Sequence, residues 1–481
     1  MAEMTVTPVA THGFFVDGRW IEEGDLVEVR APYDGGVIAR VVQGRREHAA
    51  AAIAAAVKAF GTTRRLPAFE RQRVLRQVAE TIADRKDEFS RTLALEAGKP
   101  IKAARTEVER SIFTFNVAAE ESTRIYGEVL PLDWQEFTAG RWGMVRRFPL
   151  GPVAGITPFN FPLNLVAHKV APAIAAGCPM VLKPAPQTPL CALMLAECVQ
   201  QAGWPDGGLN VLPLSNEDAS LLVTDDRIKL ISFTGSVPVG WDLKRRAGKK
   251  KVALELGGNA AVIVHSDADL PYAADRCVSG GFGYAGQSCI SVQRILVEHS
   301  VYGRFTDLLV DGVRNLKAGD PLDDNTDVGP LIRESDAIRT VNWIEEAVHA
   351  GARLLCGGGR NGSVVEPTVL TGTKPEMKVN CNEVFGPVVT VEPYKNFDEA
   401  LRRVNQSSFG LQAGLFTRDA KLLFQAYEEL EVGGLIAGDV PSFRIDHMPY
   451  GGVKDSGLGR EGLRYAIEEM TEPRLLVMNL R

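Results

Sequence analysis

Between residues 150 and 235, short apolar runs alternate with longer segments in which apolar positions recur at helical spacing. The short runs are Val153–Ile156, Met180–Leu182, Leu209–Leu212 and Ile228–Phe233. The helical segments are 163–176, 188–202 and 216–224. Parallel strands need a long crossover connection, so this alternation is typical of βαβ units. The pattern predicts an α/β fold with a parallel sheet and helices on its faces.

The N-terminal region carries a different pattern. After a strand-like start around Phe14–Val29, it is mainly helical as far as residue 125. Positions 45–60 are rich in alanine, and 68–97 keep helical spacing up to Gly98, where a helix is expected to end. Residues 125–148 alternate as strands do.

A second αβ region begins near residue 256. Its helical patterns lie at 271–280, 301–316, 334–350 and 418–430, and a last strand is expected at Pro473–Leu480. A chain of 481 residues is too long for one hydrophobic core and predicts two to four domains. Because no low-complexity linker separates the regions, we expect the domains to pack together.

The composition is that of an ordinary soluble globular protein, with 45% apolar and 24% charged residues. A net charge of −6 argues against a nucleic-acid surface, because phosphate binding requires concentrated Lys and Arg. No run of 18 apolar residues predicts a membrane span, and the first residues lack the pattern of a signal peptide. We expect a cytoplasmic protein that binds neither nucleic acid nor a membrane.

The seven cysteines are odd in number and lack C-x-x-C spacing, so neither a disulfide framework nor a metal site is expected. Four of them lie in apolar contexts typical of buried, inert thiols: Cys178, Cys191, Cys198 and Cys277. Cys289 follows the polar residues Gly-Gln-Ser, and a loop there could present it to a cleft as a nucleophile. The alternative is an inert thiol beside a flexible turn.

The pattern G-x-G-x-x-G occurs at 281–286, 357–362 and 457–462. A dinucleotide site needs a strand before this pattern and a helix after it, so that phosphates meet the helix N-terminus. None of the three segments has both neighbours. The glycines at 281–286 are instead expected to let the chain turn between a helix and a strand, so that Cys289 reaches the cleft.

A better phosphate site lies within 228–248. An apolar strand ends at Phe233, and Thr234, Gly235 and Ser236 then turn into a helix. Gly235 permits a tight turn, and the free N–H groups of the helix start can meet a pyrophosphate. An ordinary capped helix is the alternative.

Three further polar residues stand in apolar surroundings. Lys183 ends a buried strand, where parallel sheets bind ligands, although it could simply reach solvent. Glu255 lies in an apolar run; burial would raise its pKa and suit a general base, whereas an edge strand would leave it facing water. The amide of Asn160 could donate to an oxyanion or bond its own backbone in a turn.

Taken together, these segments resemble the NAD(P)-dependent aldehyde dehydrogenase superfamily. The motifs that carry the resemblance are TPFNFPLN, LKPAPQTP, SFTGSVPVG, LELGGN, GQSC, EVFGPVV and MPYGGVKDSGLGREG. They span about 160–460 in this order, and the flanks are compatible. The chain is most similar to the branch of lactaldehyde, phosphonoacetaldehyde and non-phosphorylating glyceraldehyde-3-phosphate dehydrogenases.

The resemblance implies a role for each matched residue. Cys289 would attack the aldehyde to give a thiohemiacetal, Asn160 and the Cys289 N–H would hold the oxyanion, and Glu255 would activate water to release the acid. The residues expected to contact NAD or NADP are Pro158, Phe159, Lys183, Pro186, Thr234, Gly235, Ser236, Gly240, Glu383 and Phe385. The residues expected near the substrate are Phe161, His168, Ser288 and Arg444.

The resemblance also implies the architecture. A Rossmann-type cofactor domain would comprise 1–124 and 147–255, and an α/β catalytic domain 256–450. A small β arm of 125–146 and 451–481 would join copies of the chain into a homodimer or homotetramer.

Two departures bear on specificity. NAD-preferring members often have Glu three residues after the lysine, and Pro186 at this position favours NADP or dual use. Members that grip phosphorylated trioses can have Arg immediately before the nucleophile, and Ser288 here favours a small uncharged hydroxyaldehyde such as lactaldehyde. The alternative is an anionic aldehyde held by Arg444 or an arginine of the N-terminal domain: glyceraldehyde 3-phosphate, phosphonoacetaldehyde or succinic semialdehyde.

A second class of enzyme is a cofactor-independent cysteine esterase that uses Cys289 with Glu255. The set formed by SFTGSVPVG, Lys183 and Glu383 argues against it, because such a hydrolase has no need to hold a ribose.

Overall fold

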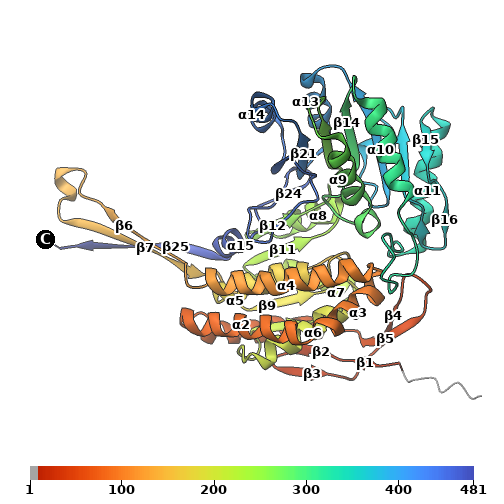
Figure 1. Ribbon diagram of the computed structural model, residues 1–481. Helices are drawn as coiled ribbons and strands as arrows, with labels where there is room; N and C mark the ends of the chain where they lie inside the picture. Colours follow the sequence, from red (N-terminus) through yellow and green to blue (C-terminus); the bar gives the residue numbers. More distant parts are fainter. Residues whose placement is uncertain (1–8, 481) are drawn as a thin grey trace, which may run out of the picture.

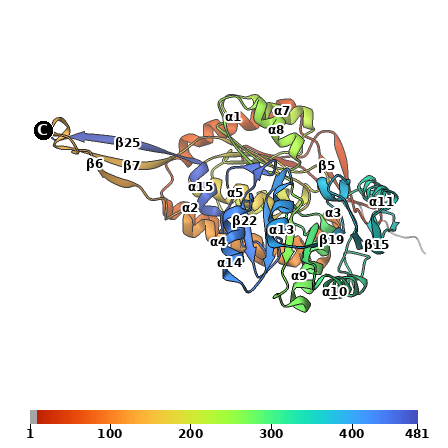
Figure 2. The same cartoon turned by 90° about the horizontal axis from the view of Figure 1, so that it is seen from above.

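Figure 1 shows two parts, each built from a sheet and its helices, with a long β arm that extends from one side. Figure 2, seen from above, shows the same arm clear of the body. The structure is a computed structural model and describes residues 9–480. None of the helices in this stretch combines the length and the apolar character that spanning a membrane requires.

The first sheet has eight strands. Their order is β24 (Gly457–Leu458), β12 (Lys251–Glu255), β11 (Leu230–Thr234), β8 (Val153–Ile156), β9 (Met180–Lys183), β10 (Leu209–Val211), β2 (Phe14–Val16) and β3 (Arg19–Ile21). The run from β12 to β10 is parallel, and β24 and β2 add antiparallel edges. The parallel sheet predicted from the apolar runs is therefore confirmed.

Helices pack around this sheet. They are α1 (Arg46–Thr63), α2 (Ala68–Asp84), α3 (Lys86–Ala97), α4 (Ile101–Glu121), α5 (Asn164–Ala176), α6 (Leu190–Gln201), α7 (Asn216–Thr224), α8 (Val237–Arg246) and α15 (Leu463–Glu469). Figure 2 shows α1, α7 and α8 grouped on one side and α2, α4 and α5 on the other.

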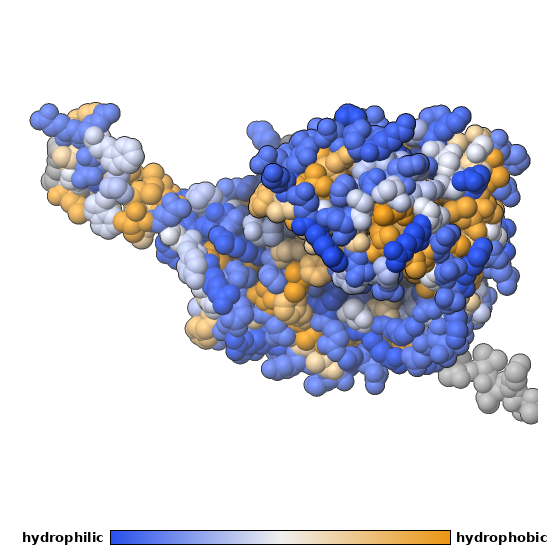
Figure 3. All heavy atoms as spheres, turned by 45° about the horizontal axis from the view of Figure 1, so that its top comes forward, coloured by the Kyte–Doolittle hydropathy of each residue, from blue (hydrophilic) through white to orange (hydrophobic). Residues whose placement is uncertain are grey.

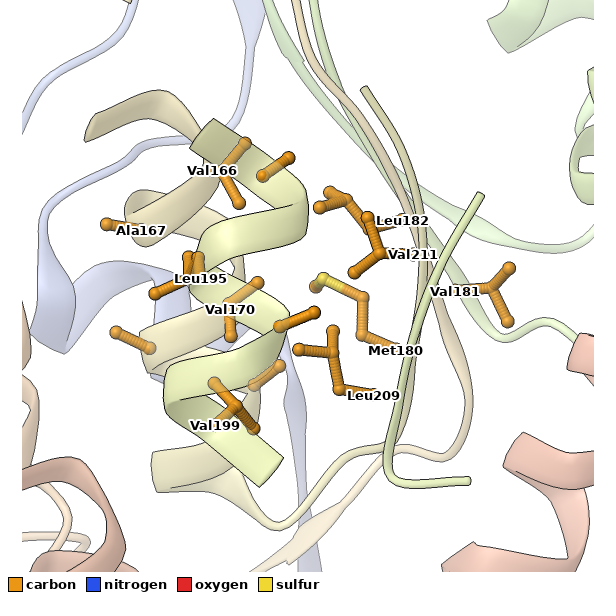
Figure 4. Close-up of a cluster of buried hydrophobic side chains, with 14 of the residues drawn as sticks. Val166, Ala167, Val170, Met180, Val181, Leu182, Leu195, Val199, Leu209 and Val211 are labelled. Atoms are coloured by element: carbon orange, nitrogen blue, oxygen red, sulfur yellow. The ribbon is translucent and has the colours of Figure 1, made fainter. Parts of the chain in front are cut away.

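The core beside β9 explains why its sequence is apolar without alternation. In Figure 4, Met180 and Leu182 point toward two helices, whereas Val181 points away from them. Successive side chains of a strand face opposite sides of a sheet, and here both sides are covered. The whole strand is consequently buried, including Lys183 at its end.

The second sheet has seven strands. Their order is β15 (Arg353–Cys356), β18 (Thr368–Thr371), β19 (Val388–Tyr394), β14 (Arg294–Glu298), β13 (Ala261–Val264), β21 (Gln412–Phe416) and β22 (Gly434–Ala437). All pairs are parallel except β15 with β18. The helices of this part are α9 (Leu270–Phe282), α10 (Tyr302–Arg314), α11 (Glu334–His349), α12 (Lys378–Cys381), α13 (Phe397–Asn405) and α14 (Ala420–Glu429).

The arm is a three-stranded antiparallel sheet in the order β25 (Thr471–Asn479), β7 (Arg141–Pro149) and β6 (Glu128–Pro131). It joins the two segments in which the sequence predicted strands. The remaining strands form small sheets: β1 (Thr11–His12), β5 (Val37–Val42) and β4 (Leu26–Arg30); β16 (Arg360–Asn361) and β17 (Val364–Val365); β20 (Phe409–Gly410) and β23 (Val453–Lys454).

The helical pattern predicted over 68–97 is divided into α2 and α3. The break falls at Arg85, whose φ of −102° and ψ of 20° lie outside helical values. The expected end at Gly98 is present, with φ of 64° in the left-handed region that glycine adopts without strain. The predicted domain boundaries stay predictions, although β24 and α15, from the last 31 residues, belong to the first part rather than to the arm strands.

The strand order of the first sheet identifies where a ligand would bind. The chain runs from β8 through β9 to β10 in one direction, then returns to place β11 and β12 on the other side of β8. At such a topological switch point the connections leave in opposite directions and open a crevice at the carboxyl ends of the strands. Pro158, Phe159 and Asn160 follow β8, and Thr234 ends β11.

Candidate active site

A cavity of about 430 Å³ lies where the carboxyl ends of β8 and β11 meet the loop before β14. Most of the predicted site residues line it: Pro158, Phe159, Asn160, Phe161, Thr234, Gly235, Ser236, Glu255, Ser288, Cys289, Glu383, Phe385 and Arg444. Lys183, Pro186, Gly240 and His168 are not among its lining residues. The fold thus brings Cys289, Glu255 and the start of α8 to one place.

The strand-end side, as we call Pro158, Phe159, Lys183, Pro186 and Thr234–Ser236, holds polar side chains that lack partners. Ser236 precedes α8, yet its hydroxyl makes no capping bond. The Thr234 hydroxyl is buried and unbonded. The ammonium of Lys183 is buried without a hydrogen bond or ion pair in the described chain, and burial lowers its pKa to about 8.

These unpaired groups indicate whether the residues present could hold a dinucleotide. A buried ammonium or hydroxyl without a partner is costly, and ribose hydroxyls would supply the missing bonds. The free N–H groups at the start of α8 suit phosphate oxygens. Gly240 allows α8 to approach the sheet, since a Cβ there would lie 2.4 Å from Leu256 Cδ2. The residues present therefore fit NAD or NADP.

Glu383 approaches the cavity from the second part. Its Oε1 accepts a hydrogen bond of 2.9 Å from the Gly258 N–H, and burial raises its pKa to about 7. Gly257 leaves room for it, because a Cβ there would lie 2.2 Å from Glu383 Oε2. Phe385, at a left-handed φ of 51°, packs edge-on against Phe159 with 5.9 Å between ring centroids.

The first glycine pattern forms a turn, as the sequence suggested, rather than a phosphate loop, and the structure adds that this turn is strained. After α9, Tyr284 and Ala285 adopt φ of 50° and 53°, which costs non-glycine residues roughly 1–2 kcal/mol each. The Tyr284 hydroxyl donates to the Ala97 carbonyl at 2.8 Å, and its ring lies 4.4 Å from the buried ammonium of Lys99. These contacts hold the turn that presents Cys289.

Cys289 is half-buried, and its sulfur lies 3.0 Å from the Tyr450 hydroxyl oxygen. Burial raises the thiol pKa to about 12, and the Tyr450 hydrogen bond opposes that rise. The backbone N–H of Cys289 makes no hydrogen bond within the described chain. Asn160 donates from Nδ2 to the Gln287 carbonyl at 2.9 Å, which leaves its second amide N–H free.

Glu255 ends β12 and is buried, so the alternative of an edge-strand glutamate facing water is wrong. Burial raises its pKa well above the usual value, and the neighbouring Glu461 carboxylate adds to the rise. Against the effect of burial, Lys169 and Arg444 lower the pKa of Glu461 to about 2. The pair therefore contains one carboxyl that holds its proton and one that stays ionised, an arrangement typical of acid–base sites.

Glu461 belongs to a network of charged and polar side chains near Glu255, which we call the arginine cluster. It comprises Arg110, His168, Arg444, Asp446 and Glu461. Arg110 pairs with Asp446 at 2.6 Å, and Asp446 also contacts His168 at 2.8 Å. Arg444 donates to Glu461 at 2.9 Å and lies 3.4 Å from His168. Both arginines line the cavity, and the Arg444 Nε is buried without a partner.

Sequence reasoning did not single out Arg110, Tyr450, Asp446 or Glu461. Arg110 lies on α4, where it is one of several charged residues and has no local signal. Tyr450 and Glu461 stand within the last of the seven motifs, which was matched as a whole. That motif could have identified Tyr450 and Glu461 as site residues, but not Cys289 and Arg444 as their partners.

The remaining cysteines lie away from the cavity. Cys178, Cys191, Cys198 and Cys277 are buried, as predicted, and burial raises their pKa values. Within residues 9–480, no group of three or more His, Cys, Asp or Glu side chains is arranged to hold a metal ion.

Comparison with known families agrees with this geometry. Residues 20–476 match the aldehyde dehydrogenase family. The chain is 44% identical to 3-sulfolactaldehyde dehydrogenase of Priestia aryabhattai, with 99% of this chain and 100% of that protein covered.

Two solved structures are also similar. Aldehyde dehydrogenase 21 of Physcomitrella patens, in complex with the reaction product succinate, is 46% identical with a TM-score of 0.97 over 98% of this chain and 99% of that one. The glyceraldehyde-3-phosphate dehydrogenase of Methanocaldococcus jannaschii, complexed with NADP, is 40% identical with a TM-score of 0.92 over 95% of this chain and 100% of that one.

Proposed function

This chain belongs to the aldehyde dehydrogenase family, and we propose that it oxidises a small anionic aldehyde to its carboxylic acid with NAD or NADP. The family assignment replaces the alternative of a cofactor-independent esterase. One observation carries the choice of substrate: Arg110 and Arg444 line the same cavity as Cys289.

The mechanism uses the groups around the sulfur. Cys289 attacks the aldehyde carbon, and the free N–H of Asn160 and the backbone N–H of Cys289 stabilise the oxyanion of the thiohemiacetal. A bound NAD or NADP would supply the hydride acceptor that the conversion of this thiohemiacetal into a thioester requires. Glu255 then takes a proton from a water molecule, which attacks the thioester and releases the acid.

Lys169, Arg444 and Glu461 together set the charge state of Glu255. Glu255 must be ionised to take a proton, and the positive charges of Lys169 and Arg444 favour that state against burial. Lys169 lies 3.4 Å from Glu461, which keeps a second carboxylate beside Glu255 ionised. That second negative charge raises the pKa of Glu255, which makes Glu255 a stronger proton acceptor once it is ionised.

The strand-end side would hold the cofactor. Lys183 would bond the adenosine ribose, Ser236 and the start of α8 the pyrophosphate, and Glu383 the nicotinamide ribose. Pro186 offers no carboxylate to repel a 2′-phosphate, which supports NADP or dual use.

The sequence favoured an uncharged hydroxyaldehyde because Ser288 precedes the nucleophile. The arginine cluster favours the alternative, since a guanidinium binds carboxylate or sulfonate oxygens by charge-assisted hydrogen bonds. The names of two relatives support this choice: sulfolactaldehyde carries a sulfonate, and succinate is a dicarboxylate.

Steady-state assays with four aldehydes test the proposal. Lactaldehyde, succinic semialdehyde, 3-sulfolactaldehyde and glyceraldehyde 3-phosphate would each be supplied with NAD and with NADP. We expect kcat/KM for at least one anionic aldehyde to exceed that for lactaldehyde by roughly tenfold or more. A preference for lactaldehyde would contradict the anionic substrate, and Cys289→Ala should abolish turnover of every aldehyde.

The arm would join copies of the chain. Leu475, Leu476 and Val477 on β25 are about half exposed, and Trp134 beside β6 is 86% exposed. Figure 3 shows such apolar side chains at the surface of the arm. Exposed apolar strands favour burial against a partner, which supports a homodimer or homotetramer that sedimentation measurements would detect.

A further inference from the structure

Tyr450 holds its hydroxyl against the nucleophile from a fixed position. Its ring is 2% exposed and packs with Ile290 and Leu411 beside Cys289. Its backbone N–H donates to the Glu461 carbonyl at 3.1 Å, and the Glu461 N–H donates back at 2.6 Å. Both the side chain and the backbone are therefore anchored, and the distance of 3.0 Å between its oxygen and the Cys289 sulfur is maintained by the surrounding packing.

Arg444 lies over the face of the same ring. Its guanidinium carbon is 3.7 Å from the Tyr450 ring centroid, and Arg444 also pairs with Glu461 at 2.9 Å. A cation on the face of a phenol attracts the electrons of the ring. This polarisation makes the hydroxyl a stronger hydrogen-bond donor.

The direction of the hydrogen bond follows from the surroundings. Burial raises the pKa of Tyr450 well above the usual value, so its oxygen keeps its proton near neutral pH. A protonated phenol can donate to a sulfur anion, and a charged acceptor makes such a bond stronger than a neutral one. The charged groups that also act on the sulfur are Glu383, Arg444 and Glu255. Within residues 9–480 none of these three bonds to the sulfur, whereas Tyr450 does.

We propose that Tyr450 is a catalytic residue whose hydroxyl donates to the Cys289 sulfur and stabilises the thiolate before the aldehyde arrives. The thiol proton leaves to solvent, and Tyr450 retains its own. This inference rests on the proposed role of Cys289 as the nucleophile and adds the group that offsets the cost of burying its negative charge.

The test measures the thiolate directly. The rate of Cys289 alkylation by iodoacetamide would be followed against pH by mass spectrometry of the Cys289 peptide, in the wild type and in Tyr450→Phe. The variant retains the ring and its contact with Arg444 and removes only the hydroxyl. We expect the kinetic pKa of Cys289 to rise by roughly 1–2 units, with a similar logarithmic fall in alkylation rate below that pKa.

Tyr394→Phe is the matched control, because Tyr394 is also buried and bonded to a side chain, His265, but does not touch Cys289. Its Cys289 profile should equal that of the wild type. Tyr450→Met, which also lacks the hydroxyl, provides a second variant if Tyr450→Phe does not fold. An unchanged or lowered Cys289 pKa in a folded variant would overturn the proposal.

Alkylation needs neither aldehyde nor NAD(P), so its outcome is independent of the proposed reaction. A shifted pKa without aldehyde oxidation would contradict the proposed function and leave the Tyr450–Cys289 bond supported. Normal aldehyde oxidation with an unshifted Cys289 pKa would support the proposed function and contradict the role of Tyr450.

Discussion

The strand-end side and the arginine cluster contribute to the same site but are built in opposite ways. Every residue of the strand-end side ends a strand of one sheet or closely follows one, and its polar side chains lack protein partners. The arginine cluster combines α4, α5 and the segment 444–461, and its charged side chains are held in place by ion pairs with one another. Local backbone geometry builds the first, and contacts between distant segments build the second.

This difference has an energetic consequence. An unpaired group that awaits a ligand acts largely alone, so a substitution there should change cofactor binding and little else. Paired buried charges depend on one another, and removing one leaves its partners uncompensated. Substitutions in the arginine cluster should therefore affect substrate binding and the proton balance around Glu255 together.

The largest effect on turnover is expected in Glu255→Gln, because Glu255 lies between the strand-end side and the arginine cluster. Loss of the base should lower steady-state turnover by roughly 10²- to 10⁴-fold, while the first turnover still yields reduced cofactor. In the wild type, kcat should rise with pH as Glu255 loses its proton, with an inflection above the ordinary glutamate pKa because burial raises it.

Stopped-flow measurement of reduced cofactor separates these steps. The rise of kcat with pH should disappear in Glu255→Gln, and the exposed Glu376→Gln should behave as the wild type. Loss of the first turnover in Glu255→Gln would contradict a role limited to hydrolysis.

A smaller effect is expected from Arg110→Gln within the arginine cluster. Losing one charge-assisted contact should raise KM for an anionic aldehyde by roughly 10- to 100-fold, with little change for lactaldehyde. The KM for NADP should stay constant, because the strand-end side is built separately. Arg105→Gln, on the same helix but paired with Asp324 at the surface, is the control. An equal rise for lactaldehyde would show that Arg110 does not recognise the anion.

On the strand-end side, Pro186→Glu should act on the cofactor alone. A carboxylate there would repel a 2′-phosphate and lower kcat/KM for NADP by roughly tenfold, and NAD should be used as well or better. Assays with each cofactor at saturating aldehyde check this, with Pro186→Ala as the uncharged control. A change in KM for the aldehyde would contradict the independence of the strand-end side and the arginine cluster.

The smallest effect concerns stability. In Gly240→Ala the new Cβ would lie 2.4 Å from Leu256 Cδ2, so α8 must shift, at a cost of about 1–3 kcal/mol. The thermal midpoint should fall and KM for the cofactor should rise. Gly61→Ala, in α1 with open space around it, should instead stabilise the protein slightly. An unchanged thermal midpoint in Gly240→Ala would mean that the Leu256 side chain moves aside without a loss of stability.

Much of the fold and half of the site could be predicted from the sequence because their signals are local. The strands β8 to β11 follow from apolar runs, and the position of Lys183 or Thr234 follows from the strand that each one ends. The turn before Cys289 was also readable, since glycines and polar residues mark it. What could not be read is that Tyr284 and Ala285 take left-handed conformations there, because contacts with Ala97 and Lys99 hold them.

The sequence by itself therefore determined the family, the parallel sheets and the residues that lie at strand ends, because each depends on neighbours along the chain. Only the tertiary structure decided that Arg110, on a helix far from the motifs, lines the same cavity as Arg444. It also decided that Tyr450 contacts Cys289 and that Glu255 shares its surroundings with Glu461. Such pairings depend on how distant segments pack and on the balance of buried charge, and neither is recorded in any short stretch of residues.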